Sequence, residues 1–263
     1  MTENRYFVDG QAVAAEAFVL RADDDGLLRG IAVFETMRTH KGRIFRATQH
    51  LKRLIDSAAV VNIETPGFES LSQELQSAMT DYPNEAKVRL TLTVGGKRLL
   101  WISPLDTTLV QRPLRVATLE WEPPPWFNGR IKHCSRALNH VARTQAGVDE
   151  IFWVGSDNCL TEGTRSNIFA VIDGVMVTPP DDGRLLCGVT RGTILELSGK
   201  AGINVEEAPI RLGDQYTELY LSSTLRNLAP VIELNGKPAP GGGPVGNQME
   251  ALLEELMDRE CSE

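Results

Sequence analysis

Two residues of opposite charge, Lys132 and Glu162, have side chains suited to Schiff-base and acid–base chemistry. Lys132 follows a proline-rich stretch and precedes a helix expected to begin at Ser135. Burial and the positive end of that helix would both lower the pKa of its amine, and a neutral lysine amine forms Schiff bases. Glu162 lies between two expected strands among small polar residues, where a single carboxylate could keep a heterocyclic nitrogen protonated. The simpler interpretations are a solvated lysine at a domain boundary and a glutamate in a turn.

Hydroxyl groups and a helix start offer places where an anion could bind. Residues 188–191 read Gly-Val-Thr-Arg and open an expected helix, so exposed backbone N–H groups and the Thr190 hydroxyl suit a phosphate. Ser223 and Thr224 end an expected buried strand and add further hydroxyl groups. The simpler interpretations are an ordinary helix cap at Thr190 and a polar strand end.

Arg53 is a further cationic candidate. It lies beside the apolar stripe of a helix expected to begin at Thr48, and it shares one edge of that helix with His50 and Ser57. A surface arginine is the simpler interpretation of this position. The histidines and cysteines do not have the spacing of a zinc site, so we expect no metal.

The composition is that of an ordinary globular protein and excludes several classes. The chain has 263 residues, is 42% hydrophobic and 24% charged, and is neither disordered, collagen-like nor stapled by disulfides. Its net charge of -8 argues against a nucleic acid partner. The first residues are polar, without a secretory leader, and no apolar run is long enough to cross a bilayer. We therefore expect a cytoplasmic protein with no membrane partner.

Consecutive prolines at 123–125 mark the expected domain boundary, because prolines interrupt helices and central strands. We expect a small N-terminal domain at 1–120, a proline-rich linker at 121–131 and a larger C-terminal domain at 132–263. The two domains differ in their expected elements. The first has a helix from Thr48, another at 68–79, and strands at 32–38, 43–45, 88–94, 99–102 and 114–119.

The second expected domain combines a few helices with many short strands. Its helices are expected at 135–146, 190–201 and 248–259, and its strands at 150–154, 168–172, 175–177, 218–222 and 230–234. Short strands linked by turns favour a mixed, barrel-like sheet over a doubly wound parallel one. The sequence as a whole predicts an α+β fold.

The order of the candidate residues along the chain resembles that of the class IV aminotransferases, the fold-type IV pyridoxal phosphate enzymes. This family includes branched-chain aminotransferases, D-amino acid aminotransferases and aminodeoxychorismate lyases. The matching segments are Val-Phe-Glu-Thr-Met-Arg at 33–38, Ile-Lys-His at 131–133, Leu-Thr-Glu-Gly-Thr-Arg-Ser-Asn-Ile-Phe at 160–169, Leu-Cys-Gly-Val-Thr-Arg at 186–191 and Ser-Ser-Thr at 222–224. The resemblance implies a two-domain fold-type IV enzyme, with a small N-terminal α/β domain and a larger, barrel-like C-terminal domain.

The resemblance also implies a cofactor, pyridoxal 5'-phosphate, and a role for each candidate residue. Lys132 would form a Schiff base with the cofactor and then act as general base, while Glu162 would pair with the pyridine nitrogen. The residues implied to hold the cofactor phosphate are Arg53, Val189, Thr190 and Thr224, and Ser223 is a further residue expected to bind the cofactor. The residues expected to contact the substrate are Phe34, Arg38, Arg98 and Arg136.

The chain departs from its relatives in the loop that binds the substrate carboxylate. Many members carry two arginines, or an arginine and a histidine, in this loop. Residues 94–100 read Val-Gly-Gly-Lys-Arg-Leu-Leu here and leave Arg98 for that role. Residues 132–136, Lys-His-Cys-Ser-Arg, are closer to the Lys-His-x-Asn-Arg pattern of aminodeoxychorismate lyases, with Ser135 in place of the asparagine.

Two activities therefore stay open. We expect an aminotransferase that moves an amino group between an amino acid or amine and a keto acid. The alternative is an aminodeoxychorismate lyase that makes 4-aminobenzoate and pyruvate. A non-catalytic binding protein is disfavoured, because it has no need for Lys132 and Glu162 together. Family members complete their substrate pocket from a neighbouring subunit, so the resemblance also implies a homodimer, with residues 95–100 as the crossing contribution.

Overall fold

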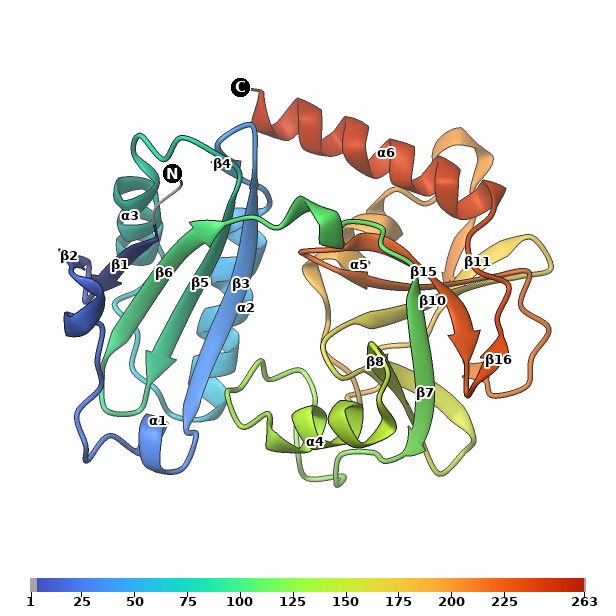
Figure 1. Cartoon of the computed structure of the whole chain (residues 1–263), viewed down its shortest axis with the longest axis horizontal. Helices are drawn as coiled ribbons and strands as arrows, with labels where there is room; N and C mark the ends of the chain where they lie inside the picture. The colour runs from blue at the N-terminus through green and yellow to red at the C-terminus, as the bar shows by residue number, and fades with distance from the viewer. Residues whose placement is uncertain (1–3, 263) are drawn as a thin grey trace. The chain divides into compact units, whose positions relative to one another are not determined.

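The chain forms two compact units in a computed structural model that describes residues 4–262 (Figure 1). The first unit is Met1–Asp106 together with Ile131–Arg136 and Met257–Glu263. The second is Thr107–Arg130 together with Ala137–Leu256. The first unit is thus built from three separate stretches of the chain.

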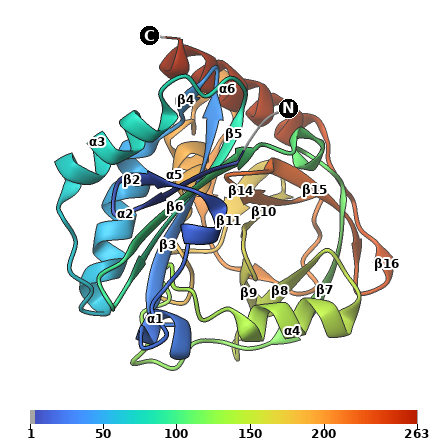
Figure 2. The ribbon, with the colours of Figure 1, turned by 60° about the vertical axis from the view of Figure 1, so that its left-hand side comes forward.

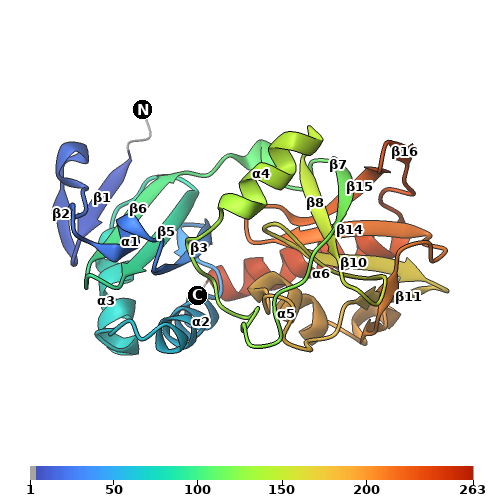
Figure 3. The same cartoon turned by 90° about the horizontal axis from the view of Figure 1, so that it is seen from below.

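An antiparallel sheet of six strands forms the first unit, in the order β2-β1-β6-β5-β3-β4. Its strands are β1 (Arg5–Val8), β2 (Gln11–Val13), β3 (Ala32–His40), β4 (Arg43–Ile44), β5 (Ala86–Thr93) and β6 (Arg98–Pro104). Helices α2 (Ala47–Val60) and α3 (Phe68–Met79) lie on one face of this sheet (Figure 3). A 3-10 turn at Ala15–Ala17 and the short helix α1 (Asp25–Leu28) precede β3.

Alternation along β3 decides which of its side chains pack against the helices. Val33 and Met37 are fully buried and form one apolar cluster with Leu51 and Leu54 of α2. Because side chains alternate along a strand, the residues between them point to the opposite face of the sheet. One face of β3 therefore belongs to the core of the unit, and Phe34, Thr36 and Arg38 lie on the other.

The β3–β4 hairpin binds the last turns of helix α6 (Pro244–Cys261). The carboxylate of Asp258 lies 2.5 Å from the His40 ring and 2.9 Å from the Lys41 ammonium group. These contacts belong to the first unit, which includes Met257–Glu263. The final turns of α6 are thus part of the N-terminal sheet unit.

A mixed sheet of ten strands forms the second unit, in the order β12-β11-β10-β14-β15-β7-β8-β9-β13, with β16 paired to β15. Three neighbouring pairs, β11–β12, β15–β7 and β7–β8, are parallel and the other pairs are antiparallel. The strands are β7 (Leu114–Glu120), β8 (Glu150–Val154), β9 (Cys159–Gly163), β10 (Asn167–Ile172), β11 (Val175–Thr178), β12 (Val205–Glu207), β13 (Ile210–Arg211), β14 (Glu218–Ser223), β15 (Asn227–Leu234) and β16 (Lys237–Pro238).

The second sheet curls around its own apolar core (Figure 2). Phe152 of β8, Leu160 of β9, Ile168 of β10 and Leu221 of β14 are buried in a single cluster. Side chains from strands that lie far apart in the sheet can share one cluster only if the sheet bends around it. Helices α4 (Ala137–Ala146) and α5 (Val189–Glu196) belong to this unit with most of α6, as do 3-10 turns at Thr107–Leu109 and Lys200–Gly202.

The expected α+β class and the barrel-like mixed sheet are confirmed, but several elements differ from expectation. The strand expected at 114–119 is β7, which pairs with β8 and β15 in the second sheet and not with the N-terminal half. For this reason the chain passes to the second unit after Asp106, ahead of the proline-rich stretch at 121–131. Lys132 then lies in the first unit, not in the C-terminal one.

The expected helix boundaries also differ from those observed. Helix α4 begins at Ala137 instead of 135, and α6 begins at Pro244 instead of 248. Helix α5 ends at Glu196, ahead of the expected 201, and Gly199 follows it with a φ of 79° that a helix cannot continue. Within residues 4–262, no helix has both the length and the apolar character needed to cross a bilayer.

Candidate active site

A short extended segment around Lys132 is hydrogen-bonded to the beginning of β3. The Phe34 N–H donates to the Lys132 carbonyl at 2.9 Å, and the Cys134 N–H donates to the Ala32 carbonyl at 2.8 Å. On its other side, the Lys132 N–H donates to the Ser57 hydroxyl of α2 at 3.1 Å. The backbone of Lys132 is therefore fixed by both the sheet and a helix of the first unit.

The half-buried Lys132 side chain lies beside Phe34, another residue selected from the sequence. Its Nζ is 5.1 Å from the centroid of the Phe34 ring, within the range of a cation–π contact. The guanidinium carbon of Arg89, on β5, lies 3.9 Å from the centroid of the same ring. The aromatic ring thus has two cationic neighbours in the first unit.

Arg53 binds a carboxylate that was not selected from the sequence. Glu35 is fully buried, and its two oxygens accept hydrogen bonds from Arg53 Nε at 2.6 Å and Nη2 at 2.8 Å. One of these oxygens also lies 2.7 Å from His50 Nδ1. A clue was present, because Glu35 occupies a core position between Val33 and Met37 in the alternation of β3.

The charges of Glu35 and His50 are set by this buried contact. Burial acts to raise the pKa of Glu35, but the charge of Arg53, the interaction with His50 and the hydrogen bonds from both together outweigh it and hold that pKa well below its ordinary range. Burial lowers the pKa of His50, and the charges of Arg53 and Lys132 add to this against the attraction of Glu35. Glu35 is therefore ionised and His50 neutral at pH 7, with the His50 Nδ1–H donating to Glu35.

The outer face of the first sheet carries several cationic side chains. Arg38 is buried and pairs across the sheet with Lys87, while Arg89 pairs with Thr36. Residues directly opposite one another in an antiparallel pair point to the same face. Arg89 was missed in the sequence, although its alternation with Lys87 along β5 was visible there.

The other two arginines expected to contact substrate have different surroundings. Arg98 pairs with Leu92, on the face that packs against the helices, and its guanidinium lies 2.7 Å from the Glu74 carboxylate of α3. It is therefore on the opposite face from Phe34 and Arg38. Arg136 is half-buried in the Lys132 segment, where its charge adds to burial in lowering the pKa of His133.

In the second unit, the Glu162 carboxylate accepts a hydrogen bond from the Leu186 N–H at 2.9 Å. The turn that follows Glu162 is built around a second, buried acid, Glu150. Glu150 accepts hydrogen bonds from the Thr164 N–H at 3.0 Å, from the Thr164 hydroxyl and from the Ser166 hydroxyl at 3.3 Å. The Leu186 N–H thus orients the Glu162 carboxylate, and Glu150 holds the turn that follows it.

Helix α5 begins with Gly188, Val189 and Thr190, as expected for an anion site. Its N-cap is Gly188, which supplies no side-chain cap to the first-turn N–H groups. A Cβ on Gly188 would lie 2.1 Å from the Asn167 side-chain oxygen, so only glycine fits here. The first turn therefore keeps its backbone N–H groups and the Thr190 hydroxyl available to an anion.

The hydroxyl cluster at the end of β14 lies near this helix start. Ser222 pairs across the sheet with Asn167, the residue that contacts Gly188. The Ser222 hydroxyl is buried and has no hydrogen-bond partner among the described residues. Ser223 and Thr224 follow and are half-buried. Because buried hydroxyls are nearly always hydrogen-bonded, Ser222 fits a site that a polar ligand would complete.

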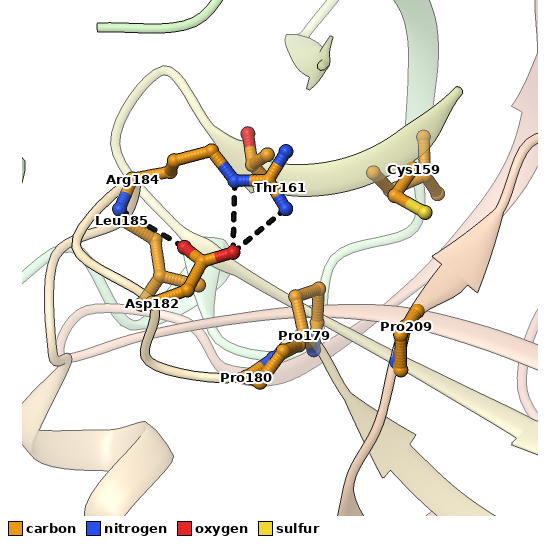
Figure 4. Close-up of a pocket in the computed structure, with 9 residues that line it drawn as sticks. Cys159, Thr161, Pro179, Pro180, Asp182, Arg184, Leu185 and Pro209 are labelled. Atoms are coloured by element: carbon orange, nitrogen blue, oxygen red, sulfur yellow. Dashed lines mark hydrogen bonds and ion pairs between the residues drawn. The ribbon is translucent and has the colours of Figure 1, made fainter. Parts of the chain in front are cut away.

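A small pocket elsewhere in the second unit has an ion pair between two of its lining residues (Figure 4). The Asp182 carboxylate binds the Arg184 guanidinium at 2.7 and 2.9 Å. The described residues that line the pocket are Cys159, Leu160, Thr161, Pro179, Pro180, Asp182, Arg184, Leu185 and Pro209, and none of them is a predicted site residue. This pocket has no evident part in the chemistry considered above.

The model of the family named amino-transferase class IV matches residues 32–234. The chain belongs to the class IV aminotransferase family. A Methanocaldococcus jannaschii protein named "Putative branched-chain-amino-acid aminotransferase" is 31% identical to this aminotransferase, over 97% of the chain and 94% of the relative. The expected family and its cofactor, pyridoxal phosphate, are thus confirmed, whereas the roles of individual residues stay predictions.

Two further relatives come from Mycobacterium tuberculosis. One, named a bifunctional aminodeoxychorismate lyase / D-amino acid transaminase, is 25% identical over 89% of this chain and 92% of its own. The other is the solved, PLP-bound structure of a hypothetical aminotransferase, which superposes with a TM-score of 0.89 at 23% identity, covering 98% of this chain and all of that one. The second likeness confirms the fold-type IV architecture expected from the sequence.

A pH experiment tests the neutral state assigned to His50. Because the pKa of His50 is lowered on folding, the unfolded chain binds this proton more readily, and stability falls as the pH drops below the ordinary histidine pKa of about 6.5. His50→Gln keeps a side-chain donor but cannot titrate. Urea unfolding at about pH 7.5 and about pH 5.5 should show a larger loss of unfolding free energy for the wild type than for His50→Gln. Equal losses in the two proteins would contradict the assignment.

Proposed function

We propose that this class IV aminotransferase transfers an amino group between an amino acid or amine and a keto acid, with Lys132 as its catalytic residue. The observation that carries the proposal is the placement of Lys132. Its backbone is hydrogen-bonded to β3 and to Ser57 of α2, while its amine lies 5.1 Å from the centroid of the Phe34 ring. A reacting lysine needs this kind of fixed attachment, because its long side chain has many rotamers.

The remaining residues fit the groups of pyridoxal phosphate. We assign the phosphate to Arg53 together with Val189, Thr190, Ser223 and Thr224. The uncapped first turn of α5 and the unpaired Ser222 hydroxyl support this assignment within the second unit. Backbone N–H groups and hydroxyls can bind a phosphate in a protein whose net charge is -8.

We assign to Glu162 the pairing with the pyridine nitrogen. The Leu186 N–H, donating at 2.9 Å, orients this carboxylate. Bound pyridoxal phosphate supplies an electron sink for charge that develops at the substrate Cα. Glu162 would keep the ring nitrogen protonated. The Lys132 amine would remove the Cα proton of the amino donor and, in the second half of the transfer, give a proton to the Cα of the acceptor.

We propose Arg38 and Arg89, with Phe34, as the substrate-binding residues of the outer sheet face. Arg89 and the Lys132 amine both lie close to the Phe34 ring, so an amino acid whose nitrogen is near Lys132 could place a carboxylate at a guanidinium. Arg136 belongs to the same Lys132 segment and stays a candidate. We do not propose Arg98 for this role, because it lies on the opposite face and is paired with Glu74.

Aminodeoxychorismate lyase is the second candidate function. It is supported by the sequence of the Lys132 segment, Lys-His-Cys-Ser-Arg, and by the bifunctional relative. We also propose a cytoplasmic location. Within the described residues, Cys134, Cys159, Cys187 and Cys261 form no disulfide, which is consistent with a reducing compartment.

Replacing Lys132 tests its attachment to the cofactor. The wild-type holoenzyme should be yellow, and Lys132→Ala should lose the visible absorbance of lysine-linked cofactor, because alanine has no amine. Lys87→Ala is the matched control, since Lys87 lies 4.5 Å from the Trp101 ring of the same unit and is assigned no role. An unchanged visible band in Lys132→Ala would show that another residue carries the cofactor.

A half-reaction distinguishes the two activities. An amino donor alone should convert the bound cofactor to its amine form, pyridoxamine phosphate, and a keto acid should restore the original spectrum. A lyase would instead release pyruvate from aminodeoxychorismate without any acceptor. Formation of 4-aminobenzoate by a protein that gives no amine form with a panel of L- and D-amino acids and amines would select the lyase.

We also propose a homodimer, with residues 95–100 contributing to the substrate pocket of the neighbouring subunit as the family resemblance implies. Light scattering of the active holoenzyme should give twice the chain mass of 28.9 kDa. A monodisperse monomer with full activity would contradict this proposal.

A further inference from the structure

We propose that Glu35 is a positioning residue that fixes the guanidinium of Arg53 for the cofactor phosphate. This inference rests on the proposed function, in which Arg53 binds that phosphate. Glu35 would touch neither cofactor nor substrate. It would act through Arg53 alone, because the pairing with Glu35 fixes which edge of the guanidinium faces a ligand.

The two hydrogen bonds to Glu35 use the Nε–Nη2 edge of the Arg53 guanidinium. Arg53 Nε and Nη2 donate to the two oxygens of Glu35 at 2.6 and 2.8 Å, a bidentate pairing. A guanidinium has five N–H groups in one plane, so Nη1 lies on the side away from this fork. The fork to Glu35 therefore fixes the plane and the direction of the Arg53 guanidinium.

Glu35 and Arg53 differ in how far their side chains are buried. The Glu35 side chain is 0% exposed and the Arg53 side chain 13% exposed, so the carboxylate lies beneath and the arginine is the group that a ligand can approach. His50 contacts the same carboxylate at 2.7 Å from the adjacent turn of α2. Glu35 is thus held by two side chains of α2, Arg53 and His50.

Stability alone does not account for this network. Removing two charges from water is costly, and well-packed apolar residues often replace a buried ion pair with no loss of stability. Glu35 occupies a position in β3 between the apolar core residues Val33 and Met37. An ionised acid among these apolar side chains of β3 is explained if Arg53 needs a fixed orientation.

The same helix face also holds the reacting lysine. Arg53 and Ser57 lie four residues apart on α2, and Ser57 accepts the backbone N–H of Lys132. The contact of β3 with α2 therefore supports both the backbone of Lys132 and the orientation of Arg53. A change in Glu35 should disturb the arginine without removing the lysine contact.

The experiment compares two probes that differ only in the phosphate: pyridoxal phosphate and pyridoxal. Each is titrated into apoenzyme prepared from the full chain, and the ratio of the two dissociation constants measures phosphate recognition. Glu35→Gln should reduce the preference for pyridoxal phosphate by about 10- to 100-fold, the scale of a charge-assisted hydrogen bond. Affinity for pyridoxal should change little, which separates positioning from a general loss of structure.

Matched variants control for the loss of an ion pair and for folding. Glu74→Gln removes the carboxylate partner of Arg98 in the same unit and should leave the ratio unchanged. Arg53→Lys keeps the charge but cannot bridge Glu35 and phosphate with a planar fork, so it should lower the ratio as Glu35→Gln does. Arg53→Lys also tests the proposal independently if Glu35→Gln does not fold.

The outcomes distinguish this inference from the proposed function on which it rests. An unchanged ratio in Arg53→Ala would show that Arg53 does not bind the phosphate, and both the phosphate assignment and this inference would fail. A lowered ratio in Arg53→Ala together with a wild-type ratio in folded Glu35→Gln would overturn the inference alone. A wild-type ratio in Arg53→Lys would overturn it as well. Lowered ratios in all three variants, with Glu74→Gln unaffected, would support it.

Discussion

Backbone hydrogen bonds between β3 and the Lys132 segment are the contacts on which the chemistry proposed for Lys132 depends. A lysine amine can reach a defined position only if the Cα that carries it is held, because its side chain has many rotamers. The bonds to Ala32 and Phe34 hold the segment from the sheet, and the Ser57 hydroxyl holds it from α2. Sheet order in the first unit is therefore a condition for placing the reactive group.

The two faces of β3 serve different purposes. On the inner face, Val33 and Met37 join the apolar core while Glu35 binds Arg53. On the outer face, Phe34 lies beside the Lys132 amine. Because a strand alternates its side chains, these neighbours in sequence reach separate environments. The inner face of β3 thus binds Arg53, and its outer face lies beside the Lys132 amine.

The sequence was informative wherever local pattern determined the structure. Alternation predicted β3, and a glycine followed by a threonine predicted the start of α5. It failed for β7, because a lone strand has no local signal for which sheet it will join, and that choice depends on pairing with distant β15. Glu35 was missed for a related reason. Its importance depends on Arg53 and His50, which lie on another element and meet it only in the folded unit.

The discontinuous first unit has a consequence for biosynthesis. Met1–Asp106 leaves the ribosome first, but Ile131–Arg136 and Met257–Glu263 belong to the same unit and are separated from each other by most of the second unit. Asp258, the partner of His40 and Lys41, is therefore made only after the entire curled sheet has been translated. Until then, the β3–β4 hairpin of the nascent N-terminal sheet lacks its Asp258 partner. The unit that emerges first is therefore the last to be completed.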